Sequence, residues 1–491
     1  MPKVLFRLQF CKVSIWLIFF CGFGELAAQQ GGPDEDTTVT YPSEYFAQFQ
    51  PYSVNDMLQR IPGINLARGG GSSRGGPGSS QGGNRRGLGA GGDQVLINGR
   101  RIAGKENEGS SQLSRIPARE VDYIEIIRGT SGDLDVRGGT QVINIVLTQD
   151  QARTSFAYEV NLDRALNGEF IPGGKFSATG QRGALSYFLS AEREPRYDFR
   201  DGFERAFDAD GVLAETVKRD SIEDAWPISL VANFGYEFSS NDTANFNLQW
   251  TGNDNDQDTD RVISSFQQGI VSNRVIERDT QPADDDSWEV GGDYMHFFQN
   301  GSRWKTLFII NESENLSVRS RYKVDGSLET RDLYLSNFEN NKERIVRSSY
   351  IFDFSGSQSI EAGIERAQTI LDTSLQLGLS TGSEGGERFG GLAPITDSMG
   401  TVEEMRYEYF AIHNWSINSR MTLETTFLFE DSTISQTGSK ANSRDFNFFR
   451  PKFDYRFDIT PSFQFRATIE KDVAQLSFRD FTAGVDFADD E

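Results

Sequence analysis

The sequence predicts an antiparallel transmembrane β-barrel preceded by a small α/β domain. Three features lead to this prediction: a secretory leader, a stretch at residues 44–150 that mixes short helical and strand patterns, and long segments of apolar–polar alternation from about residue 152 onward. Alternation with a period of two over roughly 9–11 residues matches a tilted strand that crosses a bilayer. We therefore expect a membrane all-β protein with a compact domain in front of its sheet.

The first 28 residues have the layout of a secretory signal peptide. A basic stretch is followed by the apolar run 13–23 and by small residues that end at Ala28, which is the order that a leader requires. The apolar run is shorter than the roughly 20 residues of a spanning helix. Both cysteines, Cys11 and Cys21, lie in this leader, so we expect no disulfide and no cysteine metal site in the mature chain.

Residues 44–150 are predicted to form the α/β domain, after a short polar and acidic segment at residues 29–43. The first helix has Ser53 at its start, a residue type that caps helix N-termini, and Pro62-Gly63 at its end. The predicted elements are helices at 53–61 and 111–116, a hairpin at 94–102, and strands at 121–128 and 142–147.

Residues 151–491 are predicted to form the barrel, because tight turns and long connections alternate between the strands. Tight turns are expected at 239–242, 299–302, 355–358, 417–420 and 460–462, and long acidic loops at 251–286, 314–344 and 370–403. An outer-membrane barrel has short turns in the periplasm and long loops outside, whereas a soluble sandwich gives no reason for this alternation. Aromatic residues near strand ends fit interfacial girdles; these are Trp226, Trp250, Trp288, Trp304 and Trp415.

The strand count points to an incomplete barrel. About thirteen strands follow residue 152, whereas closed barrels of a single bacterial chain have an even number. The chain ends in the acidic run 487–491, without a final amphipathic strand. We therefore expect a sheet that is truncated at its C-terminus, open and curved, with an unpaired last strand.

Composition and motifs argue against several function classes. A formal net charge of −23 makes nucleic acid a poor partner. The two histidines, His296 and His413, lie on the aromatic phase of predicted strands, away from any carboxylate cluster, so neither a catalytic nor a metal site is predicted. Residues 253–260 are acidic enough for calcium, but without a regular ligand spacing a solvated loop is favoured. Residues 87–92 fit G-x-G-x-x-G but lack the flanking strand and helix of a nucleotide site.

Four ordered blocks within the α/β domain carry a family resemblance. They read VNDMLQRIPGI at 54–64, GGDQVLINGRRIAGK at 91–105, IPAREVDYIEIIRGTSGDLDVRGG at 116–139 and QVINIVL at 141–147. In these blocks, and in the order of leader, small domain and barrel, the chain resembles the TonB-dependent outer-membrane receptors. The resemblance implies that residues 44–150 form a plug inside the barrel.

The resemblance also implies roles for individual residues. The segment Asp36, Thr37, Thr38, Val39 and Thr40 occupies the place of the TonB box, which adds a strand to the periplasmic energy-coupling protein TonB; an acidic tail is the alternative. Glu125 and Arg128 match a block whose charges lock plug to barrel. From strand phase, Glu424 or Glu470 is the expected partner of Arg128.

A Gly-rich stretch at residues 68–92 is interpreted as a plug loop that faces the ligand, with a linker as the alternative. Its arginines are Arg68, Arg74, Arg85 and Arg86. If this loop contacts the ligand, the arginines favour an anionic one, because a guanidinium pairs bidentately with carboxylate or phosphate.

Taken as a member of this family, the protein is expected to lie in the outer membrane of a Gram-negative bacterium, in contact with lipid, and to import a scarce ligand with energy from TonB. Siderophore, cobalamin, sugar and peptide ligands all remain open. No cofactor and no enzymatic activity are expected. The alternatives are a passive receptor or adhesin, and a non-functional truncated barrel.

Overall fold

The computed structural model resolves two sheets, one for each predicted domain. The residues that it describes are 38–61, 94–97, 100–101, 113, 116, 118–127, 142–148, 154–381, 385–418, 420–438, 441–460, 463–471, 473 and 478. Among them, no helix has the length and apolarity needed to cross a bilayer.

The α/β domain is built on a five-stranded sheet with the order β1-β4-β5-β2-β3. Strands β2 and β5 run parallel, and the other pairs are antiparallel. The elements are β1 (Thr38–Pro42), α1 (Ser43–Ala47), α2 (Val54–Leu58), β2 (Gln94–Ile97), β3 (Arg100–Arg101), the 3-10 turn η2 (Ala118–Glu120), β4 (Val121–Ile127) and β5 (Val142–Leu147). The predicted strands and hairpin are thus confirmed, with small shifts of their ends.

Helix α2 begins where the sequence predicts, because Ser53 closes a capping box. Its hydroxyl accepts a hydrogen bond from the backbone N–H of Asp56, and the Asp56 carboxylate accepts one from the backbone N–H of Ser53. This reciprocal pair satisfies two of the donors that a helix N-terminus leaves free. The helix buries Val54, Met57 and Leu58. The second predicted helix, 111–116, lies outside the described residues except for Leu113 and Ile116, which are both buried.

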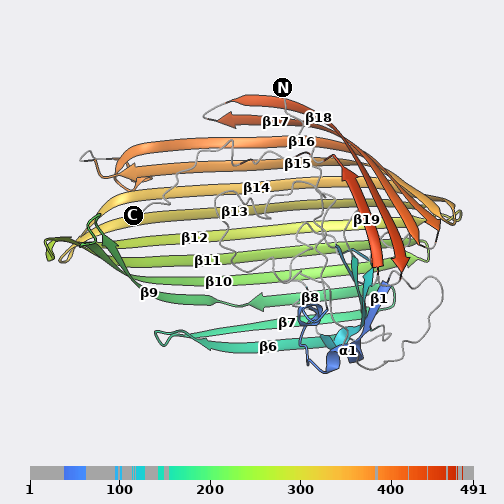
Figure 1. Ribbon diagram of the computed structural model, residues 1–491, viewed down its shortest axis with the longest axis horizontal. Coiled ribbons are helices and arrows are strands. Elements are labelled where there is room, and N and C mark those ends of the chain that lie inside the picture. Colours follow the sequence, from blue (N-terminus) through green and yellow to red (C-terminus); the bar gives the residue numbers. More distant parts are fainter. Residues whose placement is uncertain are drawn as a thin grey trace.

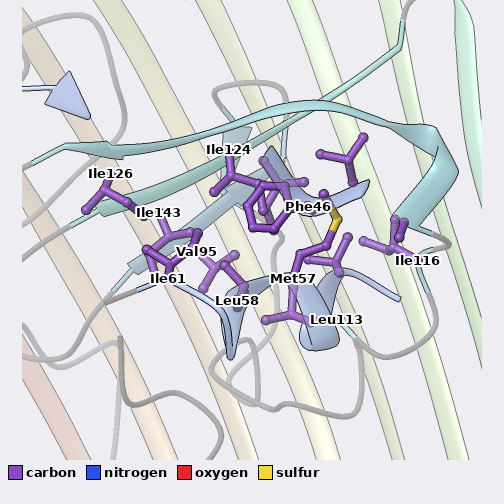
Figure 2. Packing of buried hydrophobic residues seen from close by; sticks show 14 residues of the cluster. Phe46, Met57, Leu58, Ile61, Val95, Leu113, Ile116, Ile124, Ile126 and Ile143 are labelled. Carbon is purple, nitrogen blue, oxygen red and sulfur yellow. The ribbon is translucent and has the colours of Figure 1, made fainter. Parts of the chain in front are cut away.

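The α/β domain has one apolar core, into which the helices and the sheet both point their side chains (Figure 2). Phe46 of α1 and Met57 of α2 face Ile124 and Ile143 of the central strands, and all four are almost fully buried. Phe188, which belongs to the large sheet, packs against the same cluster. The core therefore holds the domain together and also joins it to the barrel wall.

We expect Ile124→Ala to destabilise the α/β domain by about 2–5 kcal/mol, because it leaves a cavity in a core that cannot collapse fully. Ile124 has no exposed surface. Amide hydrogen exchange of β4 and β5 in the full chain measures the effect. Tyr52→Ala is the matched control, since Tyr52 is 89% exposed; equal protection in the two variants would contradict this assignment of the core.

The second sheet contains 14 antiparallel strands in the described residues (Figure 1). They are β6 (Thr154–Arg164), β7 (Phe170–Arg182), β8 (Leu185–Arg193), β9 (Arg196–Phe207), β10 (Leu213–Ser239), β11 (Asp242–Gln267), β12 (Ile270–Phe297), β13 (Arg303–Asp325), β14 (Leu328–Ser355), β15 (Gln358–Leu379), β16 (Ala393–Asn418), β17 (Met421–Gly438), β18 (Asn442–Thr460) and β19 (Phe463–Glu470). This is one strand more than expected. Strands β8 and β9 pair with successive halves of β10 and so share one position across the sheet.

The sheet is open and curved, as the sequence predicts. Its strand order runs from β19 to β6, and within the described residues neither of these two strands pairs with a further one on its outer side. All five predicted tight turns join consecutive strands at one end of the sheet. The α/β domain lies beside that end, at the right of Figure 1.

The prediction of three long loops at 251–286, 314–344 and 370–403 is wrong, because most of these residues lie in paired strands. The first is the tip of a hairpin in which β11 and β12 stay paired up to Gln267 and Ile270, and β13–β14 is a similar hairpin. The third contains a real connection only between Leu379 and Ala393. Asp and Asn have low strand propensity, but a hairpin outside the bilayer is hydrated on both faces, so backbone pairing continues without an apolar side.

The two faces of the sheet differ in polarity. Leu230, Phe234 and Tyr236 lie on one face of β10 with more than a third of their surface exposed, and equivalent residues line the same face of the other strands. The opposite, inner face carries the buried charged residues and the contact with Phe188. Exposed apolar side chains are stable on a surface that faces lipid, so the first face is the membrane face.

Tryptophans mark the far limit of the apolar band. Trp250 and Trp288 are cross-strand partners on the membrane face, opposite Leu230 of β10. Trp250 lies eight residues after Asp242, which follows a tight turn. At about 3.4 Å per residue, this corresponds to about 27 Å along the strand. This span agrees with an apolar band about 25 Å tall. Beyond Trp250, the hairpins leave the membrane.

Candidate functional site

The N-terminal strand β1 contains three residues of the predicted TonB box: Thr38, Val39 and Thr40. It pairs antiparallel with β4, with Val39 opposite Ile126. Although the domain is expected to begin at residue 44, β1 pairs with β4 and forms an edge of the α/β sheet. Since β1 ends the strand order, its other edge carries no strand among the described residues.

The α/β domain contacts the inner face of the large sheet through η2. A guanidinium nitrogen of Arg119, Nη2, lies 3.5 Å from the Ser155 hydroxyl and donates to the backbone carbonyl of Phe156. Ser155 and Phe156 belong to β6, the first strand of the sheet. Together with the packing of Phe188, these contacts attach the domain to the N-terminal strands of the barrel.

Glu120, beside this contact, is partly desolvated. Burial raises the pKa of the Glu120 carboxyl, while the hydrogen bond with Ser155 and the charge of Arg119 act in the opposite direction. A carboxyl whose pKa is higher in the folded than in the unfolded state binds more protons when folded. Its contribution to stability is therefore present at low pH and is lost as pH rises through the folded pKa.

We expect Glu120→Gln to make the stability of the η2–β6 contact less dependent on pH above about 4.5, which is the ordinary pKa of this carboxyl. In the unchanged protein, protection of the Val121 amide from hydrogen exchange should fall as pH rises above that value. The variant, which has no proton to lose there, should show a flatter profile. Arg119→Gln is the control, because it removes the attachment at every pH; a profile unchanged by Glu120→Gln would contradict the role of this group.

A network of buried charges crosses the inner face at the centre of the sheet. Glu365 of β15 bridges Arg347 of β14 and Arg406 of β16, with 3.0 Å between Glu365 Oε1 and Arg406 Nη2. Arg406 Nε also lies 3.3 Å from Glu408 Oε1. The side chains of Glu365, Arg347 and Arg406 are at most 5% exposed. The Arg347 guanidinium lies over the ring of Phe410, so three neighbouring strands are tied together on the lumen side.

The predicted plug–barrel residues are only partly placed. Glu125 accepts a hydrogen bond of 2.7 Å from Asn144 Nδ2, and both residues belong to the α/β sheet. Glu424 and Glu470 lie on the inner face, since they pair across strands with Asp454 and Lys452. Residues outside the described part of the chain are Asp36, Thr37, Arg68, Arg74, Arg85, Arg86 and Arg128.

Both histidines make local contacts on the outward face. His296 Nδ1 lies 2.7 Å from Asp242 Oδ1, and His413 Nε2 lies 3.1 Å from Gln358 Oε1. Within the described residues no group of three metal-ligating side chains comes together. Residues 253–260 lie in β11, where alternate side chains point to opposite faces.

Sequence reasoning missed Arg119 and the Glu365 network. Part of the signal was present, because Arg347 and Arg406 occupy the strand phase opposite to exposed aromatic residues such as Tyr350 and Tyr409. That phase shows that a side chain faces the lumen, but not which charges on neighbouring strands meet. The register between strands supplies this information, and single-strand patterns do not contain it.

Comparison with known families identifies the α/β domain. Residues 34–142 match the model of the TonB-dependent Receptor Plug Domain. Residues 34–142 belong to the plug-domain family of TonB-dependent receptors. The match begins at residue 34 and so includes β1, in agreement with its place in the plug sheet. The resemblance noted from the four sequence blocks is thereby confirmed.

Solved outer-membrane receptors show only distant similarity over most of the chain. The siderophore receptor PiuA from Acinetobacter baumannii has 12% identity and a TM-score of 0.43, over 87% of this chain and 62% of that one. The ferripyoverdine receptor of Pseudomonas aeruginosa has 10% identity and a TM-score of 0.43, over 88% and 56%. This chain thus spans less than two thirds of the length of these receptors.

Proposed function

We propose that this protein is an outer-membrane receptor that imports a scarce ligand with energy supplied through TonB. The single observation that carries the proposal is the plug domain seated on the inner face of a membrane-facing sheet. A plug inside a barrel blocks passive flow, so passage of a ligand requires the plug to rearrange. A periplasmic protein that pulls on the N-terminal strand supplies that work.

The coupling segment in this proposal is Asp36–Thr40. Part of it forms β1, an edge strand whose outer side carries no described partner. An exposed edge presents unpaired N–H and C=O groups, which is the surface that strand addition uses. TonB would pair with this edge, or take β1 out of the plug sheet in exchange for its own strand.

An ionic contact between the plug and the barrel wall is also part of the proposal. Arg128 follows directly after β4 and is proposed to reach a carboxylate of the inner face, with Glu424 and Glu470 as the partners expected from strand phase. The arginines of the glycine-rich stretch are proposed to face an anionic ligand: Arg68, Arg74, Arg85 and Arg86. The siderophore class is one candidate for that ligand, beside cobalamin, sugars and peptides.

The experiment that tests the proposal is a growth assay of a strain that lacks this protein, across a panel of scarce iron, cobalamin, sugar and peptide sources. We expect one nutrient class to fail in the deletion strain and to be restored by the gene. Restoration should disappear when TonB is removed or the proton gradient is dissipated. Uptake that persists without TonB would overturn energy-coupled import in favour of a passive receptor.

A further inference from the structure

Two arginines on the membrane face of the neighbouring strands β14 and β15 have no charged partner. Both strands lie near the middle of the large sheet (Figure 1). Arg344 and Arg366 share the strand phase of Val346 and Ile364, which is the exposed phase of both strands, and are themselves exposed. Within the part of the chain that the structure describes, neither guanidinium group forms an ion pair or a hydrogen bond with another side chain.

The height of Arg366 on its strand places it at the edge of the apolar band. Arg366 lies eight residues after Gln358, which follows a tight turn, just as Trp250 lies eight residues after Asp242. Both separations correspond to about 27 Å along a strand. The α/β domain lies beside the turn end of the sheet (Figure 1). The edge that carries Arg366 is therefore the external one in the proposed receptor, at the height of the lipid headgroups.

The two arginines are close enough to hold one group between them. Arg366 is the cross-strand partner of Val346, and Arg344 is the partner of Gln368. Arg344 and Arg366 are therefore diagonal neighbours on adjacent strands. Residues in this relation lie about 7–8 Å apart, within reach of long side chains. Each guanidinium group has N–H donors in a planar fork that matches a phosphate group.

The acidic residues on the same face of β13–β17 contact other groups or lie one strand further away. They are Glu312, Glu314, Asp372, Glu403 and Asp431. Lys342 Nζ lies 3.7 Å from Glu312 Oε1 and 3.3 Å from Asp372 Oδ2. Asn340 donates to Glu314, and Gln368 donates to Glu403. Asp431 is separated from Arg366 by Tyr407 of β16, so the two guanidinium groups face outward with their donors free.

Apolar side chains continue this surface from the arginines toward the turn end of the strands. Val346 is 50% exposed and Ile364 is 42% exposed, and Tyr409, which stands opposite Ile364, is 49% exposed. Cations at the headgroup level and apolar groups below them match the two parts of a phospholipid or phosphorylated glycolipid. A soluble anion uses only the first part of such a surface.

We propose that Arg344 and Arg366 form a binding site for the phosphate group of a lipid in the external leaflet, with the acyl chains of that lipid along Val346 and Ile364. Both guanidinium groups donate charge-assisted hydrogen bonds to the phosphate oxygens. The site lies on the outside of the barrel and does not involve the imported ligand, so it goes beyond the proposed import function. A lipid held there fixes the height of β14 and β15 in the membrane.

The test titrates the purified full chain in detergent with dipalmitoyl phosphatidic acid and measures bound lipid by native mass spectrometry. Dipalmitoylglycerol has the same chains without the phosphate, and inorganic phosphate has no chains. We expect the double variant Arg344→Gln/Arg366→Gln to bind phosphatidic acid about tenfold or more weakly than the unchanged chain. Arg278→Gln is the matched control and should leave the affinity unchanged. Arg278 lies ten residues beyond Trp288 on the same face of β12, paired with Asp260 and Glu329.

The two comparison probes identify the source of the phosphate. We expect dipalmitoylglycerol and inorganic phosphate each to bind more weakly than phosphatidic acid. Dipalmitoylglycerol that binds as tightly would show that the arginines do not contact the phosphate. Inorganic phosphate that binds as tightly, and is lost in the double variant, would replace the lipid by a soluble anion. Equal affinity of the double variant and the unchanged chain, or an equal loss in Arg278→Gln, would overturn the site.

Thermal unfolding separates loss of binding from loss of folding. Without lipid, the double variant should unfold at the same temperature as the unchanged chain, because both side chains are exposed and make no described contact. Phosphatidic acid should raise the unfolding temperature of the unchanged chain but not of the variant. An equal rise in the two proteins would contradict the site. Dependence of uptake on TonB tests the import proposal separately, so either proposal can fail while the other stands.

Discussion

Replacing Glu365 by glutamine is expected to lower the stability of the barrel by about 3–5 kcal/mol, because it leaves two buried guanidinium groups without their shared carboxylate. Glu365 is 1% exposed, and Arg347 and Arg406 lie on its two sides. Glutamine keeps the shape of the side chain, but it removes the charge and replaces one acceptor oxygen by an NH2 donor. Because Glu408 still lies beside Arg406, Arg347 is the guanidinium group that mainly loses its carboxylate partner.

The matched control for Glu365→Gln is Glu329→Gln. Glu329 pairs with Arg278 at 2.7 Å, but both side chains are at least 40% exposed. An exposed ion pair contributes about 0–1 kcal/mol. Denaturant unfolding of the full chain in detergent, followed by the loss of strand signal in circular dichroism, compares the two variants. Equal midpoints would show that the network on the inner face does not hold strands β14–β16 together.

Sequence patterns predict the parts of this fold that depend on one strand at a time. The alternation at 228–238 identifies which side chains of β10 meet lipid, and Ser53 identifies the start of α2. Both depend on local geometry, a period of two and a capping side chain. The turn at Ser239–Asp242 is also local, and the structure confirms it.

Features that depend on pairing between strands were not predictable in this way. Residues 251–286 contain so many Asp and Asn residues that a loop is the expected structure, yet each strand supplies the other with a continuous backbone partner. The Glu365 network was missed for the same reason. Its chemistry comes from the residues on the neighbouring strands, and these are known only from the register.

The TonB-box prediction shows a different limit. The sequence of this acidic and threonine-rich segment does not distinguish a free tail from an edge strand. A five-residue edge strand is half exposed and therefore needs no apolar residues that would reveal it. Thr38 and Tyr41 are partly buried, whereas Val39 and Thr40 are exposed. Only the pairing of β1 with β4 places Thr38–Pro42 in the plug sheet.

We expect Val39→Pro to abolish uptake of the ligand and to leave its binding at the outer surface intact. Proline removes a backbone donor and fixes φ near −65°, and strand addition depends on those backbone donors. Affinity for the purified C-terminal domain of TonB should fall more than tenfold, and growth on the imported nutrient should fall to the level of the deletion strain. Val39→Ile is the control, because it keeps the backbone and a β-branched side chain.

Because β1 also completes the plug sheet, damage to the plug has to be separated from loss of coupling. Cysteine occurs only at Cys11 and Cys21, within the predicted leader, so a single new thiol gives an unambiguous crosslink. Val39→Cys should form a disulfide with a cysteine placed in the pairing strand of TonB, and Tyr52→Cys, on an exposed part of the plug, should not. Equal crosslinking at the two positions, or none at residue 39 while uptake depends on TonB, would place the coupling strand elsewhere in the chain.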